Sequence, residues 1–383
     1  MTDWLSAEEA LTRLRVRPQT LYAYVSRGRL RAESDPVEPR RSRYRASDVA
    51  ALAEKKARGR KAADVAVAAI AWGEPVLASA ITTVRDGRLY YRGQDAVRLS
   101  RSATLEEVAR LLRGGLGLPP DEGQTAPGGP TAQSRAFAAF ARRAETDRPA
   151  QGRNADDLAS EAARLLDLMA AAIAGPEGHV QREEEAGAIH ERLGRAWRAP
   201  RDQWDAIRRA LVLLADHELN ASTFAARVTA STGASLAAAV LSGLCALSGP
   251  RHGGMAARVE AFADEAARRG WRKAVAAGEP PPGFGHALYP DGDPRATALL
   301  EAIEVEPDLA ALRRQVEAAT GQRANVDFAL VALRRSLGLP AEAPFALFAL
   351  ARTAGWLAHA IEQITTGALI RPRARYVGPP PVV

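Results

Sequence analysis

The stretch of sequence that decides the fold is residues 204–247, WDAIRRALVLLADHELNASTFAARVTASTGASLAAAVLSGLCAL. Its two ends, 204–215 and 233–247, carry apolar residues at spacings of three and four, which is the repeat of an amphipathic helix. The same repeat returns at 104–113 and 155–174, whereas strand patterns are few. The sequence therefore predicts a body that is mainly α-helical.

Two other parts of the body have different patterns. Ser79–Val84, a turn at Arg85-Asp86-Gly87 and Leu89–Tyr91 predict a β-hairpin. Residues 118–134 are rich in proline and glycine, so we expect a loop there.

The single cysteine, Cys245, cannot form an intramolecular disulfide, and its apolar neighbours predict a buried helix position.

Charge divides the chain into two parts. Its 383 residues, 25% charged and 47% hydrophobic, suit a soluble globular protein of two or three domains. Residues 1–62 hold 15 lysines and arginines against eight acidic residues, while the remaining 321 residues hold 37 of each kind. We therefore predict a basic module at 1–62, which ends in a polar linker at 54–61, and a neutral body at 63–383. No apolar run reaches the roughly 18 to 20 residues of a membrane helix and no signal-peptide pattern begins the chain, so we expect a cytoplasmic protein without a membrane partner.

The basic module has the pattern of a winged helix-turn-helix. Its helix and ribbon signals are a capping box at Ser6 and Glu9, a helix from Pro18 through Arg27, a ribbon of Leu30–Ala32 with Arg43–Arg45, and a third helix capped by Ser47. The stretch from Thr20 to Leu30, with Arg43-Tyr44-Arg45 and Ser47-Asp48-Val49, resembles the DNA-binding module of MerR-type regulators and excisionases.

That resemblance implies that the second helix enters the major groove and that the ribbon, or wing, contacts the DNA backbone. The residues placed near DNA are Gln19, Thr20, Tyr22 and Arg27, and those placed on phosphates are Arg40, Arg41 and Arg43. The alternative is a docking or dimerisation module whose arginines are merely solvated.

Three histidines lie in distinctive surroundings: His217 in Asp-His-Glu-Leu-Asn, His252 in Gly-Pro-Arg-His-Gly-Gly, and His286 in Gly-Phe-Gly-His. A zinc-protease helix needs a second histidine four residues after the first, and Ala221 occupies that place, which excludes this kind of metal hydrolysis. Glycines beside His252 and His286 let backbone approach a ligand closely. Alternatively, each histidine caps a helix or fills a turn.

Further along the chain, charged side chains could complete a site. Asp327 lies among apolar neighbours, and guanidinium groups are available at Arg295, Arg352 and Arg371. Arginines bind carboxylates in pairs of hydrogen bonds, a carboxylate can take a proton from carbon, and histidines can donate to developing oxyanions. The set could therefore serve carbon-acid chemistry on an anionic substrate, although a single Asp or Arg on a helix is usually a solvated charge.

The order of these motifs resembles citrate synthase, over about residues 66–113 and again over about 211–378. The second stretch contains Ala215–Thr223, the turn at His252, Gly283–His286, Asp293–Arg295, Asn325–Phe328, Ala351–Trp356 and Arg371–Arg373. The resemblance implies a mainly helical fold of a large domain with an inserted small domain at about 254–345, which closes over a cleft. It also implies a homodimer that condenses acetyl-CoA with oxaloacetate and needs no metal or redox cofactor.

The resemblance also implies a role for each residue. Asp327 would take a methyl proton from acetyl-CoA, His252 would stabilise the enolate, and His286 would polarise the oxaloacetate carbonyl. The substrate's carboxylates would be held by His217, Arg295, Arg352 and Arg371, the last from the partner subunit. Backbone of Pro282, Gly283, Phe284 and Gly285 would line the CoA site.

The sequence departs from the family pattern in several places. No family motif is visible at 118–205, Ala329-Leu330 follows Phe328 where many members have Tyr-Ser-Gly, and Ala287 replaces a common arginine. Propionyl-CoA, which would give 2-methylcitrate, is therefore a rival substrate, because one methylene discriminates by only about 1 to 3 kcal/mol. The second alternative is a transcription regulator whose body senses an acyl-CoA or a dicarboxylate.

Overall fold

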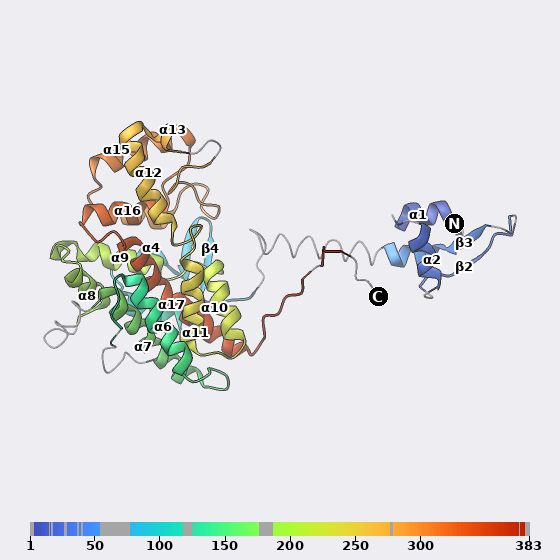
Figure 1. Cartoon of the computed structure of the whole chain (residues 1–383), viewed down its shortest axis with the longest axis horizontal. Coiled ribbons are helices and arrows are strands. Elements are labelled where there is room, and N and C mark those ends of the chain that lie inside the picture. Colours follow the sequence, from blue (N-terminus) through green and yellow to red (C-terminus); the bar gives the residue numbers. More distant parts are fainter. Residues whose placement is uncertain are drawn as a thin grey trace. The chain divides into compact units, whose positions relative to one another are not determined.

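The computed structural model describes residues 4–53, except 15, 17, 27, 28, 37 and 40, and residues 77–379, except 118–124, 126, 176–186, 276–278 and 375. The chain forms two compact units, Met1–Ala78 and Ser79–Val383, and each is described by itself (Figure 1). The predicted linker at 54–61 lies outside the described residues, as do Arg27 and Arg40.

The first unit combines short helices with a small antiparallel sheet. Its elements are β1 (Trp4–Ser6), α1 (Ala7–Leu14), α2 (Pro18–Ser26), β2 (Ala32–Ser34), β3 (Ser42–Arg45) and a helical stretch at 46–53. The strand order is β1-β3-β2, and β2 and β3 extend as a hairpin in Figure 1. Leu5, Ala10, Leu14, Leu21, Leu30, Tyr44 and Val49 form its core.

The predicted capping box is confirmed, because Ser6 N donates to Glu9 Oε2 at 2.8 Å. The first strand of the wing was expected at Leu30–Ala32 but lies at Ala32–Ser34, where Ala32 pairs with Tyr44 and Ser34 with Ser42. The prediction that Ser47 caps the third helix is wrong: the helix already begins at residue 46, directly after β3. Strand β1, whose three residues are too short to carry an alternating pattern, was not predicted.

The second unit is mainly helical, as predicted. One three-stranded antiparallel sheet contains, in order, β4 (Thr82–Arg85), β5 (Arg88–Tyr91) and β6 (Gln94–Asp95), which confirms the predicted hairpin. The helices are α4 (Ala96–Leu99), α5 (Leu105–Leu112), α6 (Ala132–Thr146), α7 (Ala155–Ala174), α8 (Ile189–Ala196), η2 (Arg201–Gln203), α9 (Trp204–Leu214), α10 (Ala221–Ser231), α11 (Leu236–Leu247), α12 (Met255–Arg269), α13 (Trp271–Ala274), α14 (Pro294–Leu300), α15 (Pro307–Thr320), α16 (Val326–Ser336) and α17 (Ala343–Thr366).

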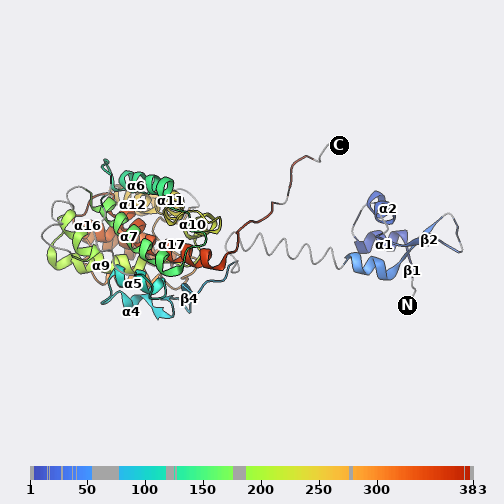
Figure 2. The same ribbon diagram turned by 90° about the horizontal axis from the view of Figure 1, so that it is seen from below.

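Helix α17 is the centre of this unit. Most of its residues are buried, and it packs against α5, α7, α9, α10 and α11 (Figure 2). Helices α12, α13, α15 and α16 lie together at one end (Figure 1), and α14 and α16 connect this group to α9 and α17. The junction of the two groups is where the predicted site residues lie. None of the helices among the described residues is long and apolar enough to cross a membrane.

Two expectations about the body are wrong. The loop expected at 118–134 ends earlier, because Thr131 caps α6 by accepting a hydrogen bond from Ser134 N. Cys245 is exposed rather than buried. Helix α11 is apolar nearly all around, so its composition does not reveal which face turns to solvent.

Candidate functional site

Two of the three histidines lie in turns that join two helices, and the third lies in a loop. His217 lies between α9 and α10, where Asn220 caps α10 through bonds from Ser222 N and Thr223 N, both at 3.1 Å. His252 lies in the glycine turn between α11 and α12, and His286 lies in the loop before α14. These turns bring together residues that are up to 69 positions apart in the sequence.

His217, His286 and Tyr289 form one aromatic cluster. His217 Nε2 lies 2.9 Å from the Tyr289 hydroxyl, and the two histidine rings are 5.3 Å apart at an angle of 84°. His286 Nδ1 accepts the backbone N–H of Leu288 at 3.1 Å. Burial, and then Arg295, lower the pKa of His286 to about 4. His286 is therefore neutral near pH 7, with its proton on Nε2.

Arg295 lies against this cluster and is 2% exposed. Its Nε and Nη2 donate to the two carboxylate oxygens of Asp293 at 2.9 and 2.8 Å, and its guanidinium lies 5.4 Å from the centre of the Tyr289 ring. Asp293 also caps α14 and accepts Val326 N at 3.1 Å. The ion pair raises the pKa of Arg295 despite its burial, so a buried, charged guanidinium is fixed at the junction of α14 and α16.

His252 is held by Ser222. The Ser222 Oγ lies 2.8 Å from His252 Nε2 and 2.7 Å from Asn220 Oδ1, and it accepts Trp356 Nε1–H at 3.1 Å. A hydroxyl has one proton, which goes either to Asn220 or to His252. In the second arrangement His252 carries its own proton on Nδ1. Burial, and then Arg352, lower the pKa of His252 to about 4, so this ring is also neutral.

Arg352, on α17, is 1% exposed and donates through Nε to the Leu214 carbonyl at 3.0 Å. Its guanidinium lies 4.8 Å from the centre of the Phe348 ring, and the His252 ring packs on the same phenylalanine at 5.6 Å. Burial lowers the pKa of Arg352 to about 10, and Asp216 opposes this shift. Arg352 therefore remains charged beside His252.

Asp327 lies in the first turn of α16, after Asn325, whose side chain accepts Asp327 N at 3.0 Å. Asn325 also donates to the Gly285 carbonyl at 3.0 Å, which joins this turn to the loop of His286. Burial raises the pKa of Asp327 to about 7, while Arg295 and Arg352 lower it. A carboxyl that titrates near neutral pH is suited to accept a proton.

The Pro282–Gly285 segment runs beside the residues that precede α16. Gly285 N donates to the Arg323 carbonyl at 2.8 Å, and Asn325 N donates to the Gly283 carbonyl at 2.9 Å. Gly283 has a φ of +84°, and a Cβ there would lie 2.9 Å from Val259 Cγ2. The Phe284 side chain packs between Phe262 and Phe328. A ligand could therefore meet the backbone of this segment but not the ring of Phe284.

The electrostatics connect these parts into one site. The pKa of His217 is well below its usual value, first because of burial and then because of four neighbours: Arg295, Arg352, His286 and His252. The structure thus brings together most of the predicted residues. Arg371 is the exception, because it lies exposed on the segment after α17, where Ile370 N donates to Ser231 Oγ at 3.2 Å.

Several members of the site were missed in the sequence. Tyr289 contacts His217, Ser222 contacts His252, Phe348 packs against His252 and Arg352, and Asp293 forms an ion pair with Arg295. Asp293 was noted in the sequence only as part of the Asp293–Arg295 motif, without a role of its own. For Tyr289, the only signal in the sequence was its position three residues after His286. That spacing alone does not distinguish a tyrosine in the site from one elsewhere in the core.

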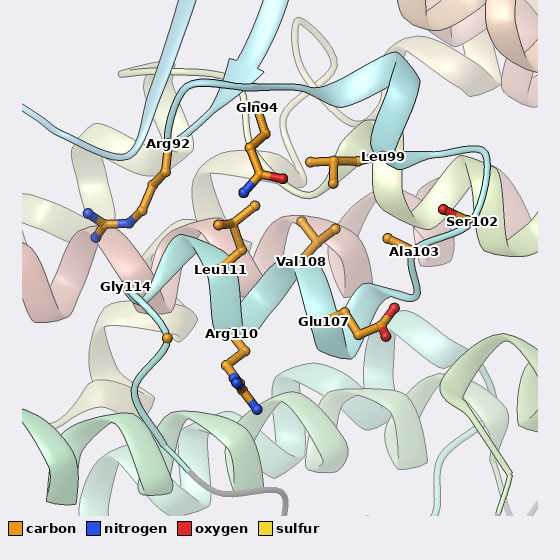
Figure 3. A pocket seen from close by; sticks show the side chains of 11 residues that line it. Arg92, Gln94, Leu99, Ser102, Ala103, Glu107, Val108, Arg110, Leu111 and Gly114 are labelled. Carbon is orange, nitrogen blue, oxygen red and sulfur yellow. The ribbon is translucent and has the colours of Figure 1, made fainter.

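A separate surface groove of about 890 Å³ lies between β6, α4 and α5 (Figure 3). Its lining includes Arg92, Gln94, Leu99, Glu107 and Arg110. It shares no residue with the histidine site. Among the described residues, no three His, Cys, Asp or Glu side chains are grouped as a metal site would require.

The first unit exposes its predicted DNA residues unequally. On α2, Gln19 is exposed, Thr20 is half-buried and Tyr22 is 63% exposed. On the wing, Arg41 pairs with Glu38 at 2.8 Å and Arg43 pairs with Glu33 at 2.7 Å. The wing therefore carries its own counterions, which the positive charge of the module did not reveal.

Comparisons with known proteins match both units. A family model described as the citrate synthase C-terminal domain matches residues 123–373, more than half of the chain. Its match includes 123–205, where no family motif is visible in the sequence. A family model described as a helix-turn-helix domain matches residues 4–57.

Individual proteins agree with the larger match. Citrate synthase 2 of Bacillus subtilis is 38% identical over 190 residues, which are 46% of this chain and 51% of that protein. 2-Methylcitrate synthase 1 of Corynebacterium glutamicum is 36% identical over 188 residues, 44% of this chain and 49% of that protein. The chain thus spans about half the length of these relatives.

Among solved structures, a ternary complex of carboxymethyl coenzyme A and oxaloacetate with the citrate synthase of Thermoplasma acidophilum has a TM-score of 0.63 and 26% identity. The likeness covers 81% of this chain and 95% of that one. With the family match over residues 123–373, it establishes that the chain belongs to the citrate synthase family.

Proposed function

We propose that the chain condenses an acyl-CoA thioester with oxaloacetate and hydrolyses the resulting thioester, giving citrate and CoA from acetyl-CoA. The observation that carries this proposal is the cluster around His217. It combines two neutral histidines and two buried arginines with a carboxyl whose pKa is about 7. The solved structure of the Thermoplasma citrate synthase is described as a complex with carboxymethyl coenzyme A and oxaloacetate, which supports the same substrate classes for this chain.

Oxaloacetate is a dianion, so its site needs fixed positive charge. Arg295 and Arg352 supply two guanidinium groups, and their burial excludes the water that would screen them. His217 adds a neutral ring that can donate one hydrogen bond. Arg371 is exposed on its own chain, and we propose that it serves the site of a partner subunit in a homodimer.

The first chemical step is removal of a methyl proton from acetyl-CoA by the Asp327 carboxylate. An acetyl methyl is a weak acid, so the developing enolate oxygen needs a donor. His252 can donate from Nδ1 if the Ser222 hydroxyl donates to its Nε2. A pKa near 7 makes Asp327 a stronger base than an ordinary aspartate while it is still largely ionised at slightly alkaline pH.

The second step joins the two substrates. The enolate carbon attacks the keto carbon of oxaloacetate while His286 donates from Nε2 to the keto oxygen, which becomes the hydroxyl of the product. Water then cleaves the citryl thioester, giving citrate and the CoA thiol. We propose that the small domain, at about 254–345, closes over the substrates and that the backbone of 282–285 lines the CoA site.

Thiol release tests this proposal. The purified chain is mixed with oxaloacetate and either acetyl-CoA or propionyl-CoA, with Asp327→Ala as the control. Thiol release that requires both oxaloacetate and Asp327 supports the synthase, and the faster acyl donor distinguishes citrate from 2-methylcitrate. No release from folded protein that binds both ligands would favour a sensor that uses the site for recognition alone.

A second function is proposed for the first unit, which is DNA binding through α2 and the wing. The family match over residues 4–57 and the exposed Tyr22 and Gln19 support it. Exposed ion pairs such as Arg43–Glu33 contribute only about 0 to 1 kcal/mol, so a DNA phosphate can replace the glutamate. A homodimer of the body would pair two such units, as two half-sites require.

Fluorescence anisotropy with labelled DNA tests this second function. The double variant Arg41→Ala/Arg43→Ala should weaken binding and reduce the slope of log affinity against log salt by about 2, if both arginines contact phosphates. An unchanged slope would exclude the wing from the DNA contact. A change of DNA affinity on adding oxaloacetate and a CoA ester would support a ligand-responsive regulator.

A further inference from the structure

Three buried polar side chains, with the half-buried Glu362, form a chain of contacts that begins beside His217. Asp216, the residue before His217, is fully buried, and its Oδ2 lies 3.1 Å from His359 Nε2. His359, on α17, is 1% exposed, and its Nδ1 lies 3.1 Å from Arg227 Nη1. Arg227, on α10, is 2% exposed and pairs with Glu362 at 2.6 Å.

The direction of each hydrogen bond in this chain is fixed by chemistry. A guanidinium group can only donate, so His359 Nδ1 must accept from Arg227. The His359 ring therefore donates to Asp216 from Nε2. Burial raises the pKa of Asp216, but His359 and Arg352 lower it by more, so this buried carboxylate is ionised.

The chain also reaches two segments outside the helices. Glu362 Oε1 accepts Ala80 N at 2.8 Å, just before β4. Arg227 Nε donates to Gln363 Oε1 at 2.9 Å, and Gln363 Nε2 donates to the Ala368 carbonyl at 2.8 Å, close to Arg371. His359 is the link on which the Asp216 end depends.

The turn that carries His217 is held through its backbone, since Gly355 N donates to the Ala215 carbonyl at 3.0 Å and Asn220 Nδ2 donates to the His217 carbonyl at 3.2 Å. The Asp216 side chain interacts chiefly with His359, which lies 3.1 Å from Oδ2, and to a lesser extent with the Thr82 hydroxyl. A Cβ at Gly355 would lie 2.2 Å from Asp216 Oδ1, which shows how closely α17 approaches the carboxylate. An ionised carboxylate that lost its donor there would have to move toward water or another donor.

We infer that His359 is a positioning residue for His217: through Asp216 it fixes the turn that aims the His217 ring at Tyr289 and His286. This inference rests on the proposed function, in which His217 holds oxaloacetate. Loss of the contact between His359 and Asp216 should therefore weaken oxaloacetate binding more than it slows the chemical step.

Steady-state kinetics on the full chain, with oxaloacetate binding measured by calorimetry, test the inference. His359→Leu removes both contacts, whereas His359→Gln keeps one donor and one acceptor. We expect the leucine variant to raise the KM and Kd for oxaloacetate by about tenfold or more while kcat changes by less than about threefold. The glutamine variant should remain within about threefold of the wild type in all three.

Leu357→Ala is the matched control, because Leu357 is a fully buried apolar residue on the same helix, two positions before His359. It should lower the melting temperature without raising KM. If the leucine variant does not fold, Arg227→Lys tests the same contact, since the single nitrogen of an ammonium cannot occupy the positions of both Arg227 Nε and Arg227 Nη1. It should raise KM about threefold or more.

Three results would overturn the inference. One is a KM that stays unchanged in the folded His359→Leu variant, or in Arg227→Lys if the leucine variant does not fold. The second is an equal rise of KM in Leu357→Ala, which would indicate general loosening of α17. The third is equal loss in the glutamine and leucine variants. If the wild type neither binds oxaloacetate nor releases thiol, the proposed function itself fails, which is a distinct outcome.

Discussion

Replacing Asp327 with asparagine should make the protein inactive and, at alkaline pH, more stable. The pKa of Asp327 rises from 3.8 to about 7 because burial disfavours its ionised form. Each tenfold change in a proton equilibrium is about 1.4 kcal/mol, so a fully dry carboxyl with this pKa would cost the folded chain about 4 kcal/mol once ionised.

The sign of the pH dependence follows from proton binding. Between about pH 4 and 7 the folded chain holds a proton on Asp327 that the unfolded chain has released, so this group makes the free energy of unfolding fall as pH rises through that window. Asparagine has no proton to lose. The free energy of unfolding of the variant should match that of the wild type near pH 4 and exceed it by about 4 kcal/mol at pH 8.

Activity should follow the opposite trend. With a pKa of about 7, only about one-tenth of Asp327 is ionised at pH 6, against about nine-tenths at pH 8. His252 and His286, whose pKa values are about 4, stay neutral over this range. The kcat/KM of the wild type should therefore fall about tenfold for each pH unit below 7.

Urea unfolding at several pH values and thiol release over pH 5.5–8.5 provide both measurements. Asp308→Asn is the control, because Asp308 is exposed and its replacement should change neither the free energy of unfolding nor kcat/KM. Asp293→Asn is unsuitable, because Asp293 pairs with Arg295. The reasoning would be refuted by an Asp327→Asn variant that is no more stable than the wild type at pH 8, or by a flat pH profile of kcat/KM.

Three further predictions concern single positions. Gly283→Ala should destabilise the protein by about 1 to 3 kcal/mol, seen as a lower melting temperature, because φ is +84° and the new Cβ would meet Val259. Ser222→Ala should lower kcat by about tenfold or more without unfolding the chain, because His252 loses its hydrogen bond to the Ser222 hydroxyl. A variant with the wild-type kcat would show that this hydrogen bond is not needed for catalysis. Cys245 should react with a maleimide in the native protein, as an exposed thiol does, and protection that grows with protein concentration would place α11 in a subunit interface.

The helices were predictable where the signals are local. The pattern at 155–174 matches α7 at both ends, because Asn154 caps its first turn and Gly175 follows its last. Asp293 likewise marks the start of α14. The exposed face of α11 was not predictable, since nearly all of its residues are apolar and only its neighbours decide which ones meet solvent.

The sequence by itself determined the family motifs, the helical class of the body and the identity of His217, His252, His286 and Asp327. These follow from residue type and from spacings of a few positions. Only the tertiary structure decided what those residues can do, because a pKa depends on burial and on charges brought in from distant segments. Asp216 meets His359 across 143 positions, and Ser222 meets His252 across 30. No local pattern encodes such contacts, since they exist only once the helices have packed around α17.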